Sequence, residues 1–113
     1  SESSGIFTFP STGIYLVQGF ATFAKDANRR YVGYLMKATT NKSSYAVVAE
    51  SYGTITVDSG SSYVYLSVSS YIDVTNTSNV KVQFGGSVPS AVTALGDSAK
   101  NLTYFNFIRL GDT

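Results

Sequence analysis

The chain alternates between short apolar segments and polar turns. Its apolar segments are rich in Val, Ile, Tyr, Phe and Thr, and clusters of Gly, Asn, Asp and Ser separate them. These residue types favour strands and turns respectively, and no long segment repeats with the helical period of 3.6 residues. The pattern predicts an all-β chain with strands at 5–9, 14–23, 31–39, 45–56, 63–68, 71–74, 80–84 and 103–110.

Two parts of this pattern leave the secondary structure open. Segments 63–68 and 71–74 form either one bent strand or two. The long connection 87–101 carries weak signals, and we expect a short helical turn within residues 92–95. About eight strands at short intervals are typical of a two-sheet sandwich or a jelly roll.

Several predicted strands are apolar at consecutive positions. The segments from Ile14 to Val17 and from Tyr34 to Met36 are examples. A two-sheet sandwich buries only alternate residues of each strand, so these strands have an apolar face to spare. The spare faces are either surface positions occupied by good strand residues or a subunit interface.

Length and charge narrow the function classes. The 113 residues suit one domain, expected at residues 5–111, with residues 1–4 as a linker or remnant. The net charge is +1, and Arg29-Arg30 is the only pair of adjacent basic residues. Nucleic-acid binding needs a basic stripe, and a membrane helix needs about 20 apolar residues. We therefore expect neither a nucleic-acid partner nor membrane insertion.

The chain has no Cys and no His, which restricts its chemistry. Disulfides, thiolate or imidazole metal sites and Ser–His catalysis are all excluded. Two carboxylates can cleave a glycoside, and Glu50 and Asp73 are the candidates in or near strands, although surface strand positions explain both. We expect no enzyme and no cofactor.

Oxygen ligands for a cation are sparse. Asp26 with Asn28, and Asp58 with its neighbours, offer the oxygen atoms that calcium prefers. Neither segment has the ligand density of a dedicated calcium loop, and plain turns explain both. We therefore expect no metal site.

Both ends of the chain resemble a known family. Residues 5–15 read GIFTFPSTGIY, which is similar to the pattern G-x-F-x-x-P-x-x-G-x-Y in the globular heads of the complement component q family. The segment 103–110 resembles the last strand of that family, although Phe107 replaces a Gly and Arg109 replaces a Leu. The family's middle Gly-Asp-x-Val signature is absent.

The resemblance implies a jelly-roll β-sandwich of about 8–10 antiparallel strands, shared with tumour necrosis factor and assembled as a homotrimer. The residues that carry it are Phe7, Pro10, Gly13, Tyr15, Phe105 and Ile108. Phe7 and Tyr15 are expected in the core on adjacent strands. Pro10 is expected to end the edge strand, and Gly13 to form a tight turn.

Candidate ligand-binding residues gather in the charged segment after the second predicted strand, joined by tyrosines at strand ends. They are Asp26, Asn28, Arg29, Arg30, Tyr31 and Tyr63. Arg suits carboxylate or phosphate groups of a glycan, and tyrosine rings suit sugar or protein recognition. We expect this segment at the end farthest from the termini, beside residues 58–62 or 75–79. A solvated hairpin without a ligand explains the same residues.

The leading functional hypothesis is a trimeric receptor-binding or adhesion head at the tip of a fibre, such as a phage tail fibre. Its partners would be itself and a cell-surface glycan or protein, and its location extracellular or on a virion surface. The lack of Cys and the many Ser, Thr and Gly residues favour a phage or bacterial fibre over an animal secreted protein. The alternative is a structural trimerisation or virion decoration domain without a ligand of its own.

Overall fold

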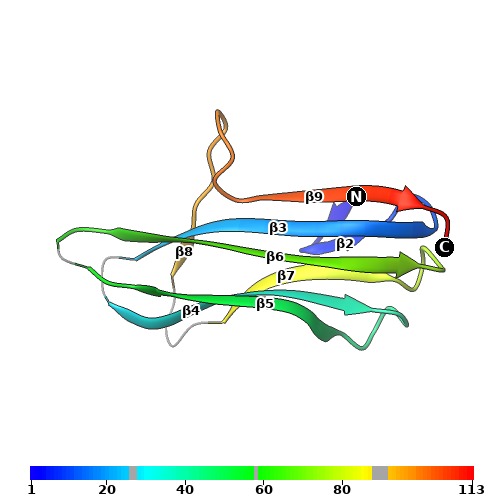
Figure 1. Ribbon diagram of the computed structural model, residues 1–113, viewed down its shortest axis with the longest axis horizontal. Helices are drawn as coiled ribbons and strands as arrows, with labels where there is room; N and C mark the ends of the chain where they lie inside the picture. Colours follow the sequence, from blue (N-terminus) through cyan, green and yellow to red (C-terminus); the bar gives the residue numbers. More distant parts are fainter. Residues whose placement is uncertain (26–27, 58, 88–91) are drawn as a thin grey trace.

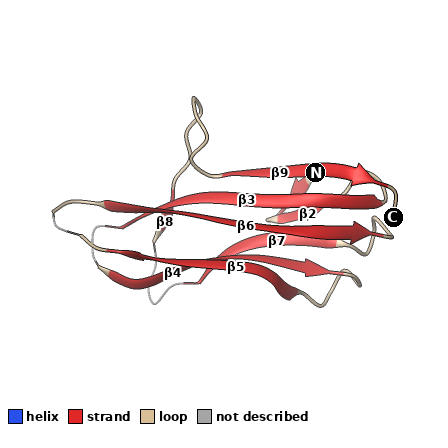
Figure 2. Ribbon diagram, in the orientation of Figure 1, coloured by secondary structure: helices blue, strands red, loops and turns tan. Residues whose placement is uncertain are grey.

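The structure is a computed structural model, and it describes residues 1–25, 28–57, 59–87 and 92–113 (Figure 1). Their regular segments are all strands, and these residues contain no helix (Figure 2). The strands are β1 (Glu2–Ser3), β2 (Ile6–Thr8), β3 (Gly13–Lys25), β4 (Arg29–Thr39), β5 (Ala46–Ile55), β6 (Ser62–Val74), β7 (Lys81–Ser87), β8 (Thr93–Ala94) and β9 (Tyr104–Gly111). The predicted all-β class is confirmed.

Two antiparallel sheets make up the molecule and fit the predicted β-sandwich. Sheet A has the order β1-β2-β7-β4-β5, and sheet B has the order β6-β3-β8, with β9 also paired to β3. Because β6 pairs with β3 along its whole length, β8 and β9 share the other edge of β3. The long strands follow the longest axis of a molecule that measures 50 × 31 × 22 Å (Figure 1).

The structure resolves the two open points of the secondary structure. Residues 62–74 form the single strand β6 rather than two strands. The helical turn expected within residues 92–95 is wrong, because Thr93 and Ala94 pair with β3 instead. Leu95 continues this pairing by donating its backbone N–H to the Thr22 carbonyl oxygen at 2.8 Å. Pairing with β3 satisfies backbone groups that an isolated turn would leave to solvent.

The placement of Phe7 and Tyr15 on adjacent strands is also wrong. Phe7 lies on β2, which pairs with β7 in sheet A, whereas Tyr15 lies on β3 in sheet B. Phe9 is the aromatic residue that joins them. It is buried, and its ring centroid lies 4.8 Å from that of Tyr15.

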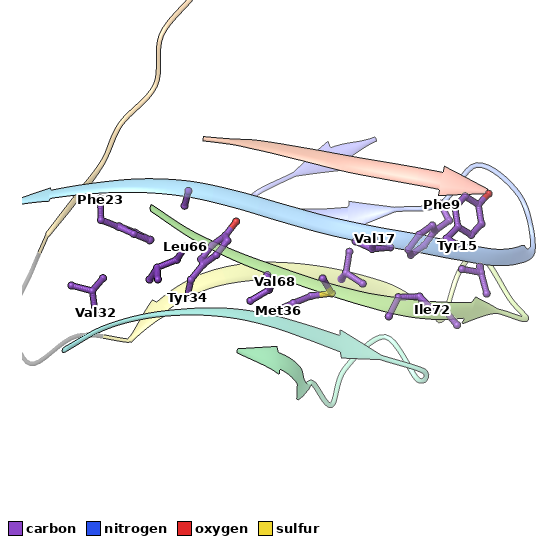
Figure 3. Close-up of a cluster of buried hydrophobic side chains, with 14 of the residues drawn as sticks. Phe9, Tyr15, Val17, Phe23, Val32, Tyr34, Met36, Leu66, Val68 and Ile72 are labelled. Carbon is purple, nitrogen blue, oxygen red and sulfur yellow. The ribbon is translucent and has the colours of Figure 1, made fainter. Parts of the chain in front are cut away.

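The core forms because inward side chains alternate along the long strands. In β3 every second residue from Gly13 to Phe23 is buried, while the residues between them are half-buried on the outer face. The inward positions of β4 and β6 follow the same period of two. Figure 3 shows the resulting apolar layer between the sheets, with Val17, Met36 and Val68 near its middle.

The turn before β3 depends on a glycine. Gly13 has φ of +146°, a conformation that residues with a side chain rarely adopt. A Cβ atom there would also lie 2.6 Å from Arg109 Nε and 2.7 Å from the Gly111 carbonyl oxygen. Arg109 occupies this space to donate from Nε to the Thr12 carbonyl oxygen at 3.0 Å. The arginine that departs from the family pattern thus fastens β9 to the turn.

The two long sides of the sandwich are closed in different ways. On one side, β5 and β6 approach so closely that a Cβ atom on Gly53 would lie 2.8 Å from Val64 Cγ2. On the other side, β2 of sheet A faces β9 of sheet B across a group of phenyl rings. We call this group the phenylalanine seam; it consists of Phe7, Phe9, Phe84, Phe105 and Phe107.

Gly19 makes room for the seam, which gives a first testable prediction. A Cβ atom on Gly19 would lie 2.6 Å from Phe84 Cε1 and 2.7 Å from Tyr34 Oη. We expect Gly19→Ala to lower the free energy of unfolding by about 1–3 kcal/mol, because the added methyl group overfills a packed interior. Urea denaturation measures the change.

Gly85→Ala is the matched control, since nothing lies within 4 Å of a Cβ atom at that position. Its free energy of unfolding should change by less than about 1 kcal/mol. Equal stabilities for the Gly19 and Gly85 variants would show that Phe84 can move aside at no cost.

Candidate binding surfaces

The outer face of sheet B carries apolar side chains from three strands. Leu16 of β3 lies between Tyr71 of β6 and Ile108 of β9, since these residues are direct partners across the sheet. Tyr71 is 69% exposed and Ile108 is 46% exposed. The two-faced segment from Ile14 to Val17 therefore divides as its sequence suggests, with Tyr15 and Val17 in the core and Ile14 and Leu16 outside.

A stack of aromatic rings continues this outer face toward β8. The Phe20 ring lies 4.6 Å from that of Tyr104 and 6.3 Å from that of Tyr65, with interplanar angles of 16° and 17°. The two tyrosine hydroxyl groups approach within 3.4 Å. The polar residues Gln18 and Asn106 separate the stack from Leu16, with a side-chain contact of 3.4 Å. We call the whole surface, from Ile14 to the ring stack, the outer face of sheet B.

At the far end of the sandwich, opposite the two termini, β3 and β5 end and β4 and β6 begin (Figure 1). Lys25 and Ser62 are partners at the last position of β3, and Arg29 is a partner of Ile55. Residues 75–79 lie at the other end, because Val74 pairs with Gly13 beside the C-terminal strand. The charged segment was expected beside residues 58–62 or residues 75–79. Residues 59–62 lie at its end of the sandwich, and residues 75–79 do not.

The candidate ligand-binding residues that the structure describes come from both sheets, since Arg29, Arg30 and Tyr31 belong to β4 and Tyr63 belongs to β6. Asn28 is exposed, and its Oδ1 accepts a hydrogen bond from the Val57 backbone N–H at 2.6 Å, which ties the two far-end connections together. Arg29 and Arg30 begin β4. Asp26 lies outside the described residues.

The two candidate tyrosines lie on opposite sheets. Tyr63, 64% exposed, lines a cleft of about 410 Å³ on sheet B together with Lys25 and Leu95. Tyr31 lies on the outer side of sheet A, where its ring meets that of Tyr52 edge-on at 6.0 Å. A single ligand would reach both tyrosines only by wrapping around the end of the sandwich.

Tyr52, which the sequence places at a strand end as it does Tyr31 and Tyr63, is an exposed residue within β5. Its ring lies across Gly33, where a Cβ atom would come within 2.6 Å of Tyr52 Cε1. Its hydroxyl donates to Glu50 Oε2 at 3.0 Å, and this carboxylate raises the pKa of Tyr52. The ring lies there because Gly33 of β4 pairs with Tyr52 of β5. The sequence alone does not give the register of these two strands.

The six residues that carry the resemblance to the complement q heads differ in burial. Gly13 and Tyr15 are buried, Phe7 is half-buried in the seam, and Pro10 is exposed. The other two, Phe105 and Ile108, are exposed on opposite sides of β9, with Phe105 toward the seam and Ile108 on the outer face of sheet B.

The two strand carboxylates that the sequence singled out lie on different sheets. Glu50 lies on β5 of sheet A, and Asp73 lies on β6 of sheet B, where it accepts a hydrogen bond from the Thr113 hydroxyl. Among the described residues, no three acidic groups come close enough to hold a metal ion. Asp58 lies outside the described residues, so its turn is not placed. No helix in the described part of the chain is long and apolar enough to cross a membrane.

No protein-family model matches the chain, and no curated protein matches it. The resemblance to the complement q heads therefore rests on the motif residues alone, and what the structure establishes is the two-sheet, all-β architecture.

The contact between Tyr65 and Tyr104 makes the stability of the fold depend on pH. The hydrogen bond with Tyr104, with smaller contributions from burial and charge, raises the pKa of Tyr65 from 10.0 to about 12. A tyrosine whose pKa is higher in the folded state stabilises the fold below pH 10, and this stabilisation is lost as the pH rises through about 12. Because Tyr65 is largely exposed, the effect on stability is small.

The measurement is an NMR titration with ¹³C-labelled tyrosine. We expect Tyr104→Phe to lower the pKa of Tyr65 toward 10, the ordinary value for tyrosine. Tyr71→Phe is the control, because Tyr71 lies outside the stack, and it should leave the Tyr65 titration unchanged. A Tyr65 pKa that does not respond to Tyr104→Phe would refute the hydroxyl contact.

Proposed function

We propose that the chain is a trimeric receptor-binding or adhesion head of jelly-roll type, at the tip of a fibre such as a phage tail fibre. The observation that carries the proposal is the outer face of sheet B. Three strands there place Leu16, Tyr71 and Ile108 in one row, in which Tyr71 and Ile108 are exposed and Leu16 is half-buried, and apolar rows of this kind mark protein interfaces. Assembly around this face would remove them from water.

The order of the strands supports the jelly roll. From β2 to β7 the chain passes from one sheet to the other at every connection except the one between β4 and β5. It passes back to sheet B after β7, where β8 and β9 follow. Such repeated crossing between two sheets is the connectivity of Greek-key sandwiches, the group that includes jelly rolls. The family motif at residues 5–15 is consistent with the same fold.

The far end is the proposed recognition surface. Asn28 and Val57 are joined there by a hydrogen bond, and Arg29, Arg30 and Tyr63 are among the first residues of strands that begin at this end. Arginines suit the carboxylate and phosphate groups of cell-surface glycans. Three copies side by side would present three such ends to one surface, and multivalency would strengthen weak single contacts. The protein would then act outside the cell or on a virion surface.

Assembly is tested by sedimentation. We expect the chain to sediment as a trimer at micromolar concentration, and Leu16→Glu to sediment as a monomer because the row would bury an unpaired charge. Val47→Glu introduces the same charge at an exposed position of sheet A and should remain trimeric. A wild-type chain that is monomeric at that concentration would exclude the proposed assembly.

Recognition is tested separately, on a glycan array and on target cells. We expect Arg29→Ala with Arg30→Ala to reduce binding at least about tenfold, the loss of one charge-assisted contact, while the trimer persists. Lys81→Ala, a change of charge on β7 of sheet A, is the control. If the double variant binds fully, the far end is not the recognition surface. If the wild-type trimer binds neither array nor cells, the chain is the structural trimerisation or decoration domain of the alternative hypothesis.

A further inference from the structure

The phenylalanine seam is the open side of the sandwich. A row of three apolar clefts follows it, with volumes of about 190, 420 and 200 Å³. Phe107 and Phe9 line the first cleft, Phe7 and Phe105 the second, and Phe84 and Phe105 the third. Shared lining residues show that the clefts are neighbours along one line.

The strand beside these clefts has a free edge. Within the described residues, β9 pairs with β3 only, so the backbone N–H and C=O groups on its other edge have no partner strand. Sheet A extends further on this side, where β1 pairs with β2 beyond the seam. Glu2 and Gly5, in and beside β1, form part of the lining of the middle cleft. The free edge and this hairpin therefore bound a channel along the seam.

Two side chains indicate that the seam is incomplete. Phe105 points toward the seam from β9 and is nevertheless 37% exposed. Tyr34 lines the third cleft and is buried, yet its Oη has no hydrogen-bond partner among the described residues. A buried hydroxyl without a partner is costly, and an exposed phenyl ring on the core side of a strand is equally unfavourable.

We propose that the seam is a strand-acceptor groove, which binds an extended peptide segment of a partner protein alongside β9. An extended backbone can pair with the whole row of N–H and C=O groups on a free strand edge. The alternate side chains of an added strand point to one face, so those facing inward would enter the row of clefts. Apolar side chains at every second position are therefore the signature of the bound segment.

Length and charge define the partner further. The eight residues of β9 can pair with about eight residues of an added strand, roughly 27 Å at about 3.4 Å per residue. Among the described residues that line the three clefts, Glu2 is the only one with a charged side chain, so a Lys or Arg in the segment near the middle cleft would complement it. This groove is an edge of sheet B, whereas the proposed trimer uses its outer face, so the two interactions are independent.

The probe is a synthetic peptide of eight residues, with Val or Phe at alternate positions, Thr between them and one Lys near the middle. We expect it to shift the ¹⁵N–¹H NMR signals of β9 and to slow hydrogen exchange at alternate β9 amides at least about tenfold. A peptide of the same composition with its apolar residues contiguous should not do so. N-methylation at alternate backbone nitrogens should abolish binding in one of the two methylation patterns, because only one set of N–H groups faces β9.

Variants of the full chain test the groove itself. Phe105→Thr should weaken peptide binding at least about tenfold, whereas Tyr63→Thr, which removes an exposed ring that lines a different cleft, should leave it unchanged. Exchanging the peptide Lys for Glu should weaken binding to the natural chain but not to Glu2→Gln. The N-methylated peptides keep the test valid if Phe105→Thr fails to fold.

Three results would overturn the proposal. The first is no change in β9 at millimolar peptide. The second is equal binding of the alternating and contiguous peptides, which would mean nonspecific adhesion. The third is signal shifts confined to the outer face of sheet B, which would mean that the peptide competes for the assembly surface. Sedimentation of the Leu16 variant reports on the trimer alone, so failure of either proposal can be told apart from failure of the other.

Discussion

The structure depends on the pairing of β3 along both of its edges. One edge is occupied by β6 over all thirteen residues of the strand, and the other is shared by β9 and β8. With both edges fixed, the strand cannot shift by one residue without exchanging its buried and exposed faces. The core, the outer apolar row and the ring stack all follow from this one register, because each contains alternate residues of β3.

The alternation of residue types was enough to predict the class of the fold and the approximate extent of most strands. It also identified the two-faced segment from Ile14 to Val17, whose residues do divide between core and surface. It failed where local signals were weak. Thr93 and Ala94 form a strand only because Ala24 and Phe23 offer them a free edge. Nothing in residues 92–95 themselves indicates that this edge is available.

The binding surfaces were less predictable, because they depend on which strands are neighbours. Tyr31 and Tyr63 are similar in sequence context, yet β4 and β6 belong to different sheets, so the two residues face away from each other. The phenylalanine seam was likewise hidden. Phe7, Phe84 and Phe105 are far apart in the chain and meet only because β2, next to the edge strand of sheet A, faces β9 at the edge of sheet B.

The connection between β8 and β9 projects beyond the edge of sheet B (Figure 1), and residues 96–101 within it are all exposed. Its return to the sheet is held by Thr22, whose hydroxyl donates to the Leu102 carbonyl oxygen at 2.8 Å. The tip therefore contributes no packing, while the base is anchored independently of what the tip contains. Substitutions and insertions at the tip are nearly free of folding cost, so this is where the protein can diversify in evolution without risk to its core.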